Sequence, residues 1–181
     1  RDLHQCDRRQ RQMCIETEYI HMNKDLEKRV QALEDTLAIQ NLKHTYLNAC
    51  DTKDVDAMIE TFVASECMID YGPVGSFSNR DELAAVFQEA ACHDYMLESH
   101  HAHNPLINII DAENATGKWA LTYNLINTND KTITTLQGEY HDVYQKIDNK
   151  WLIKETTFVG CSSINLELEE DLLKVIFAGR P

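Results

Sequence analysis

Basic side chains are scarce in this sequence. Its 181 residues include 17 lysines and arginines against 30 aspartates and glutamates, which gives a formal net charge of −13. Nucleic acids and anionic membrane surfaces are bound through basic patches, so this deficit argues against both as partners. No apolar run approaches the roughly 20 residues that a membrane-spanning helix needs. We therefore expect a protein that binds neither nucleic acid nor membrane.

Motifs for metal binding and for several common enzyme classes are also missing. The six cysteines form no CxxC pair, which argues against a zinc site. The sequence has no Gly-rich phosphate loop, no GxSxG and no HExxH. We therefore expect no cofactor and no metal. The scattered thiols indicate a cytoplasmic location; they are Cys6, Cys14, Cys50, Cys67, Cys92 and Cys161.

What the sequence does contain is enough apolar residues for one domain with a full core. Hydrophobic residues make up 43% of the chain, as in an ordinary soluble globule. Residues 1–20 are polar and basic and are expected to form a poorly ordered or partner-dependent arm. The domain is expected over residues 21–165. Residues 166–181 are expected to be a tail, and the acidic start of Asn165–Phe177 suggests a final helix there.

A long helix is predicted from about Ile20 to Cys50. Apolar residues recur at spacings of three to five along one face, and they are Leu26, Val30, Leu33, Leu37, Leu42 and Tyr46. The early part, KDLEKRVQALEDTLAIQ, is typical of a short coiled coil, although it spans few heptads. This segment packs either on its own domain or on another subunit.

Two shorter helices, a short strand and four long strands are predicted after it. Asp and Asn are frequent in the short connections between the long strands, as hairpins require. The helices are expected over Val55–Val63, capped by Thr52 or Asp54, and Glu82–Ala91, begun by Asn79 or Asp81, with a strand at Cys67–Tyr71 and long strands at 100–111, 115–128, 131–146 and 150–164. Three helices followed by an antiparallel meander predict an α+β fold, with the helices covering one face of a curved, cone-shaped sheet.

The interior of such a cone is a natural site for a hydrophobic small molecule. An open curved sheet also leaves an apolar outer face to cover, so a homo-oligomer, a trimer or a dimer, is expected.

The stretch SHHAHNPLINIID, residues 99–111, combines three histidines with the start of a buried strand. Because side chains alternate along a strand, His101 and His103 share one face and His100 faces the other way. A histidine that faces a cavity is a candidate acid or base near neutral pH. The alternative is that these are inert polar residues at the end of a strand.

The other candidate residues come from three further segments. Tyr46 and Asp51 end the first long helix, and a carboxylate against His103 would orient its ring and raise its basicity. Phenols could polarise a carbonyl or hydroxyl oxygen. The predicted catalytic residues are His103, Asp51 and Tyr46, and the predicted substrate-binding residues are Tyr123, Tyr140, Trp119 and His101.

Each of these residues also has a structural explanation. Trp119 fits pure packing, Tyr46 fits a core aromatic, and Asp51 fits a turn residue that ends a helix. A metal held by His101, His103 and Asp51 is a further alternative, but the pattern is short and unspecific.

The order of these elements resembles the SnoaL-like branch of the nuclear transport factor 2-like superfamily. The segments that carry the resemblance are LEDTLAIQNLKHTYLNACD, ATGKWALTYNL and YQKIDNKWLIKETTF, within about Leu33 to Val159. The resemblance is nearest to the bile-acid 7-alpha-dehydratases and scytalone dehydratase. It implies an α+β cone, with His103 as general base or acid, Asp51 as its support and Tyr46 as a further site residue. Where the bile-acid dehydratases carry an Asp and an Arg, this chain has Tyr123 and Gly160.

The residues and the resemblance together predict a cofactor-independent lyase or isomerase. Its expected substrate is a small, hydrophobic, cyclic, oxygenated molecule such as a polyketide, an aromatic compound or a steroid. His103 would act as base and then acid, so replacing it with Ala or Gln should abolish turnover. The alternatives are a non-catalytic binding module and a small structural subunit of a ring-hydroxylating dioxygenase. A hydrogen bond between Asp51 and His103 inside an apolar pocket would favour the enzyme. A pocket filled by side chains would favour the structural subunit.

Overall fold

The computed structural model describes residues 2–169 of the chain. Their elements are, in order, α1 (Asp2–Thr52), α2 (Val55–Ile59), β1 (Met68–Asp70), η1 (Gly72–Val74), β2 (Ser76–Phe77), α3 (Arg80–Ala90), β3 (Met96–Ile109), β4 (Asn114–Asn127), β5 (Thr132–Ile147) and β6 (Lys150–Glu167). The chain divides into two units, residues 1–37 and residues 38–181. No helix within residues 2–169 is both long and apolar enough to cross a membrane.

The first unit consists of the N-terminal part of α1. Residues 2–20, expected as a separate arm, are helical and continuous with the predicted helix. At the other end of the chain, Asn165–Glu167 belong to β6 and not to a final helix. The rest of the predicted final helix lies outside the described residues.

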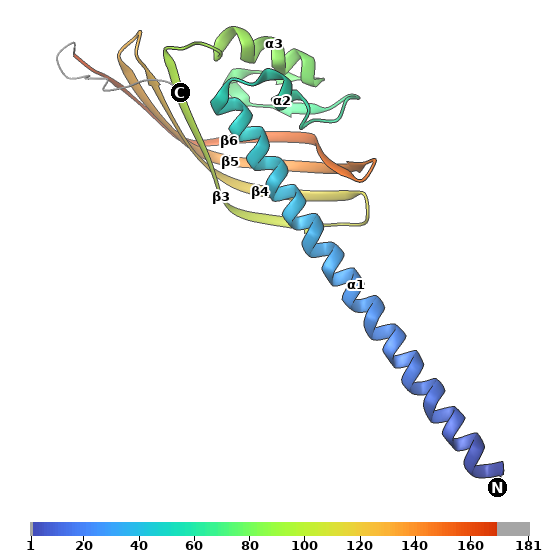
Figure 1. The fold of residues 1–181 in the computed structure, drawn as a ribbon. Coiled ribbons are helices and arrows are strands. Elements are labelled where there is room, and N and C mark those ends of the chain that lie inside the picture. Colours follow the sequence, from blue (N-terminus) through green and yellow to red (C-terminus); the bar gives the residue numbers. More distant parts are fainter. Residues whose placement is uncertain (1, 170–181) are drawn as a thin grey trace. The chain divides into compact units, whose positions relative to one another are not determined.

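The second unit is built on one six-stranded sheet with the order β2-β1-β6-β5-β4-β3. Strands β3 to β6 form an antiparallel meander, while the short β1 runs parallel to β6. Figure 1 shows this sheet curving without closing, with residues 38–52 of α1 and the helices α2 and α3 on one face. The predicted α+β architecture, three helices followed by a curved meander, is confirmed.

Local sequence explains several of the element ends. Asp54 caps α2 by accepting a hydrogen bond from the amide of Ala57 at 2.9 Å, and Asn79 caps α3 through the amide of Glu82, also at 2.9 Å. The β5–β6 hairpin turns at Asp148 and Asn149, which have φ of 49° and 63°. Asn and Asp adopt positive φ more readily than other non-glycine residues, which suits them to such a tight turn.

The core lies between the helical layer and the concave face of the sheet. Buried side chains from α1 (Ile39, Leu47), α2 (Met58) and the strands (Trp119, Ile153) pack into one cluster. Burial of this apolar surface is the main stabilising term of such a domain. The helices do not fill the whole concavity, and the space that they leave is the candidate site.

Candidate active site

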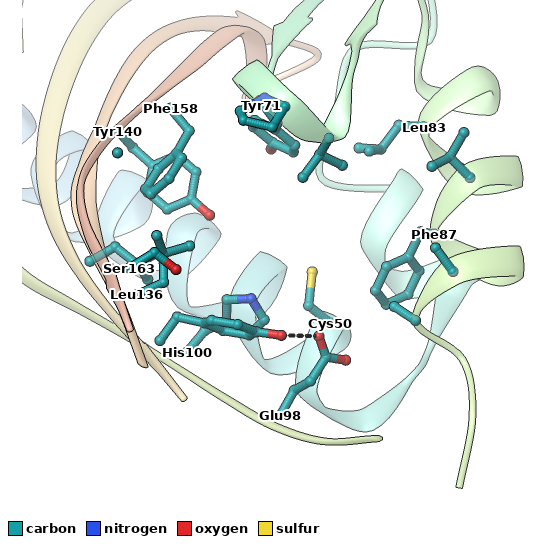
Figure 2. A pocket seen from close by; sticks show the side chains of 18 of the residues that line it. Cys50, Tyr71, Leu83, Phe87, Glu98, His100, Leu136, Tyr140, Phe158 and Ser163 are labelled. Carbon is teal, nitrogen blue, oxygen red and sulfur yellow. Dashed lines mark hydrogen bonds between the residues drawn. The ribbon is translucent and has the colours of Figure 1, made fainter. Parts of the chain in front are cut away.

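A cavity of about 690 Å³ opens between α3 and the concave face of the sheet. Its walls are mostly apolar, and Leu83 and Phe87 of α3 face Leu136 and Phe158 of the sheet across it (Figure 2). Polar side chains are fewer, and they include those of Tyr46, Cys50, Tyr71, Glu98, His100, Tyr123, Tyr140 and Ser163. A large apolar cavity with few polar groups is typical of a small-molecule site.

An aspartate–histidine pair forms part of this polar wall. The Nδ1 atom of His100, on β3, lies 2.6 Å from Oδ1 of Asp51, near the end of α1. The backbone amide of His100 donates to the same carboxylate at 3.1 and 3.2 Å. The two side chains are 15% and 9% exposed, so the pair is largely shielded from water. Asp51 thereby fixes the orientation of the imidazole and the position of its strand.

The other ring nitrogen of His100, Nε2, is not bound by Asp51. Among residues 2–169, no hydrogen-bond partner reaches Nε2, and the residue lines the cavity. Because Nδ1 donates to Asp51 when the ring is neutral, Nε2 then carries the lone pair that can accept a proton. The geometry therefore presents a base to the cavity.

The predicted partner of Asp51 was His103, and the structure places that residue elsewhere. His103 is exposed and its ring stacks on that of His101, with centroids 6.1 Å apart. His101 is exposed too, and its Nε2 lies 2.7 Å from the hydroxyl of Ser99. Neither lines the cavity, so the expected Asp51–His103 contact and the placement of His101 in the substrate site are corrected.

A β-bulge explains this difference. His103 pairs with Ala120, but the next pair is Leu106 with Lys118, so two residues of β3 stand opposite one residue of β4. Asn104, in the bulge, has a φ of 50°. The bulge inverts the alternation of faces along β3. Counting back from the inward-facing Ile107 would place His103 inside, but the inward face before the bulge holds Glu98 and His100.

Two tyrosines form a second polar group in the cavity. The hydroxyls of Tyr46, on α1, and Tyr71, just before η1, lie 2.7 Å apart. Burial is the main cause that raises the pKa of each phenol above its ordinary value. Both therefore stay protonated at neutral pH; one hydroxyl donates to the other, and the second keeps its O–H for another acceptor. The structure places Tyr46 in the cavity, as predicted, whereas Tyr71 was missed.

A third polar group surrounds Glu98. The hydroxyl of Tyr123 donates to Glu98 at 2.7 Å (Figure 2, dashed line), and Lys53 forms an ion pair with the other oxygen. The ring of Tyr123 also packs on that of His100, with centroids 4.5 Å apart. Burial, followed by the charge of Glu98, raises the pKa of Tyr123. Tyr123 thus lines the cavity as predicted and links Glu98 to His100.

A sealed network lies behind the cavity. Lys43 of α1 forms a 2.9 Å ion pair with Asp142 of β5, and both side chains are fully enclosed. Asp142 also accepts hydrogen bonds from Tyr144 at 2.6 Å and from Thr156 at 2.7 Å. Burial lowers the pKa of Lys43, against the opposing effect of Asp142. Sequence reading missed Lys43, because a lysine on an amphipathic helix is normally solvated.

Tyr140 and Trp119 border this network on different sides. Tyr140 lines the cavity, and its ring lies under the Lys43 ammonium, 3.6 Å from Nζ to the ring centroid. Trp119 is 1% exposed, does not line the cavity, and donates from Nε1 to the hydroxyl of Tyr144 at 2.9 Å. Its expected place in the substrate site is therefore corrected, and its role is packing.

Within residues 2–169, no three His, Cys, Asp or Glu side chains are grouped as metal ligands. A cysteine nucleophile does not fit the arrangement of the cavity. Cys50 lines the cavity, but burial raises the pKa of its thiol to about 12, so it is protonated at neutral pH. The groups that remain are a shielded base, His100, and several neutral phenols. They suit proton transfer to and from an apolar substrate.

The missed residues left a signal in the sequence. Glu98 and His100 are two residues apart, so they share one strand face, and both precede the bulge residues Asn104-Pro105. A proline next to an asparagine in a long strand is a recognisable bulge signal. Reading it would have moved the inward histidine from His103 to His100.

Comparison with known proteins identifies the family. Residues 31–157 match the model of the SnoaL-like domain, so the chain belongs to that family, and the resemblance noted from the sequence is confirmed. A protein from Novosphingobium aromaticivorans, provisionally described as a scytalone dehydratase, aligns with a TM-score of 0.70 and 20% identity over 77% of this chain and 92% of its own.

Two further solved structures share the fold. The type 3 hexachlorocyclohexane dehydrochlorinase of Novosphingobium barchaimii aligns with a TM-score of 0.68 and 12% identity, over 76% of this chain and 93% of its own. A protein of unknown function with a cystatin-like fold from Nostoc punctiforme aligns with a TM-score of 0.58 and 22% identity, over 70% and 91%. These likenesses establish the cone-shaped fold, and the site must supply the argument for function.

Proposed function

We propose that this SnoaL-like protein is a cofactor-independent lyase or isomerase that moves a proton on a small, hydrophobic, cyclic, oxygenated molecule. A polyketide, an aromatic compound or a steroid fits this description. The observation that carries the proposal is the Asp51–His100 pair, because His100 lines a mostly apolar cavity of about 690 Å³ and Asp51 binds only its Nδ1 atom. His100 thus takes the role that the sequence assigned to His103.

The reaction that this geometry suits best is elimination next to a carbonyl. Nε2 of His100 takes a proton from the carbon beside the carbonyl, and the electron pair of that C–H bond forms the new C=C bond. The C–O bond on the next carbon breaks, and its oxygen keeps the bonding pair. That oxygen then takes the proton from Nε2 and leaves as water. In an isomerisation, the proton returns to a different carbon instead.

Asp51 and the phenols would support these steps in different ways. Asp51 holds Nδ1 of His100 at 2.6 Å, so it orients the ring and stabilises the imidazolium that forms. Tyr46 and Tyr71 are protonated because burial raises the pKa of each; one of them donates to the other, so the second can donate to the carbonyl oxygen as negative charge develops there. The apolar walls around them exclude water and strengthen these interactions.

The names of two fold neighbours are consistent with this chemistry. Dehydration and dehydrochlorination are both eliminations, and the neighbours concerned are the protein described as a scytalone dehydratase and the hexachlorocyclohexane dehydrochlorinase. This likeness supports the reaction class only. The cavity's size and apolar lining support the substrate class.

The test measures proton abstraction and water loss on a panel of cyclic β-hydroxy ketones that includes scytalone. Solvent deuterium incorporation reports the first step, and the ultraviolet absorbance of the conjugated or aromatic product reports the second. We expect turnover by the natural protein and a loss of about 100- to 10,000-fold in His100→Gln. His103→Gln is the matched control, because it makes the same change on the exposed face of the same strand, and it should retain turnover. Loss of turnover in His103→Gln alone would contradict the assignment.

A non-catalytic binding module is the second candidate, because the same cavity could bind a molecule without transforming it. In that case panel compounds would bind equally well to the natural protein and to His100→Gln, with no deuterium incorporation in either. A purely structural subunit of a ring-hydroxylating dioxygenase is less well supported. The cavity is open and not filled by side chains, and it is lined by His100, which is paired with Asp51.

A further inference from the structure

The N-terminal part of α1 carries an apolar stripe with a regular spacing. Leu26, Val30, Leu33 and Leu37 are 44–70% exposed, and Tyr19 extends the stripe toward the N-terminus at 61% exposed. The intervals between these residues are seven, four, three and four. Asn23 divides the first interval into four and three, because it lies between Tyr19 and Leu26. A repeat of three and four is the heptad pattern of a coiled coil.

The heptad assignment places specific residue types at the two seam positions. Asn23, Val30 and Leu37 occupy the a positions, and Tyr19, Leu26 and Leu33 occupy the d positions. A β-branched residue at a with leucine at d favours two parallel strands. An asparagine at a single a position also specifies register and oligomeric state, because it is best satisfied by its own copy across the seam.

Charges beside the seam select the same arrangement. Arg29 occupies a g position and Glu34 the following e position, and both are exposed. In a parallel pair, position g of one helix faces the next e position of the other, so Arg29 meets Glu34 of the second copy on both sides of the seam. In an antiparallel pair the e positions face each other, which brings Glu27 and Glu34 together. Charge complementarity therefore favours the parallel pair.

We infer that residues 19–37 pair with the same segment of a second copy of this chain, as a parallel two-stranded coiled coil. The pairing covers the apolar stripe, aligns Asn23 with its counterpart and forms two Arg29–Glu34 pairs. An isolated helix with fewer than three heptads is marginal in water. Here the segment belongs to a 51-residue helix, so association does not have to form the helix first.

The first test compares three full-length proteins by sedimentation equilibrium at micromolar concentration. The natural chain should have the mass of two chains. Leu33→Lys places a charge at the seam and should be monomeric. Ala32→Lys, which adds the same charge one position away on the exposed side, should remain dimeric. A natural chain that is monomeric or trimeric overturns the inference, as does Leu33→Lys that stays dimeric, since the sheet would then hold the copies together.

A charge exchange tests the register without disturbing the apolar seam. Arg29→Glu and Glu34→Arg each place like charges across both sides, and each should raise the dissociation constant of the dimer by about tenfold. An equimolar mixture restores two opposite-charge pairs, so heterodimers should form with the affinity of the natural chain. If both variants dimerise as the natural chain does, or if the mixture shows no preference for heterodimers, the parallel pairing is wrong. Circular dichroism on each variant confirms that the helix content is kept.

Discussion

Two shielded carboxylates, Asp142 and Asp51, invite comparison. Asp142 is paired with Lys43, and Asp51 with His100; both pairs join α1 to the sheet. The Lys43–Asp142 pair is fully enclosed, whereas the His100 side chain is 15% exposed and lines the cavity. The two sites use the same kind of interaction, but only the second leaves a titratable atom within reach of a ligand.

The two pairs differ in whether every nitrogen of the basic side chain is enclosed by protein. The Lys43 ammonium is surrounded by Asp142 and the face of Tyr140, so nothing from solvent reaches it. An imidazole has two nitrogens, and Asp51 occupies only one of those in His100. The sealed pair can therefore serve only stability, while the open pair can hold a proton for chemistry. This division predicts that substitutions on the two sides have different consequences.

The largest effect is expected from Lys43→Met, which breaks the sealed pair and keeps a similar volume. It leaves Asp142 buried without its cation, and removing one partner of a buried ion pair costs about 3–5 kcal/mol of folding free energy. Chemical denaturation measures this loss. Adding Asp142→Asn removes the uncompensated charge, so the double variant should recover part of the loss. A single variant as stable as the natural protein would show that the pair contributes nothing.

The architecture could be predicted from sequence because its signals are local. Asp54 and Asn79 cap the helices that they precede, and the positive φ of Asp148 and Asn149 marks the hairpin. Hydrophobic periodicity predicted β1 and the four long strands, whereas η1 and β2 were not predicted. Such features depend on a few neighbouring residues, so they can be predicted without knowledge of the tertiary structure.

The site was only partly predictable because two of its determinants are not local. The bulge at Asn104 reverses the faces of β3, and Asp51 contacts His100 where His103 was predicted. The burial of Lys43 depends on Asp142, about 100 residues further along the chain. The sequence around Lys43 does not show that Asp142 lies next to it, and the sequence around Asp142 does not show Lys43. The catalytic roles themselves remain predictions.

Raising the pH should destabilise the cavity and the Lys43–Asp142 network together, because both contain buried tyrosines. Tyr46, Tyr140 and Tyr144 are buried, and burial raises the pKa of each above the unfolded value of 10.0. The folded state therefore binds these protons more tightly than the unfolded state does. The free energy of unfolding that these phenols contribute is fully present below pH 10 and is lost as the pH rises above it. Three such groups lose about 4 kcal/mol in all by pH 11.

Absorbance at 295 nm, followed together with far-ultraviolet circular dichroism, measures this effect. Part of the tyrosinate signal should appear only as the helical signal is lost. The urea-unfolded protein is the control, in which all seven tyrosines are accessible. Complete ionisation while the circular dichroism is unchanged would contradict the burial of these phenols.

Asp51→Asn tests the open pair. An amide can no longer stabilise the imidazolium of His100, so kcat on a panel compound should fall by about a hundredfold. Because Asp51 orients the base and does not contact the substrate, KM should change little. Asp51→Glu keeps the charge and should recover part of kcat if the longer side chain still reaches Nδ1. A fall in stability with no change in kcat would make Asp51 a structural residue only.

The finest comparison applies one change, tyrosine to phenylalanine, to each side. Tyr144→Phe removes the hydroxyl that donates to Asp142 and accepts from Trp119, so it leaves a buried indole N–H without a partner. That should cost about 1–3 kcal/mol of stability and leave kcat unchanged. Tyr71→Phe removes a hydroxyl whose partner, Tyr46, also borders the cavity, so water or substrate can replace the lost hydrogen bond.

The loss of stability in Tyr71→Phe should therefore be the smaller of the two, while its kcat falls by about tenfold, the equivalent of one transition-state hydrogen bond. Denaturation and turnover measured on both variants give four numbers whose pattern decides the matter. Opposite patterns in the two variants support a sealed side and a reactive side. Equal losses of turnover in both would mean that the Lys43–Asp142 network reaches the chemistry through Tyr140, and the two carboxylates would then form one site.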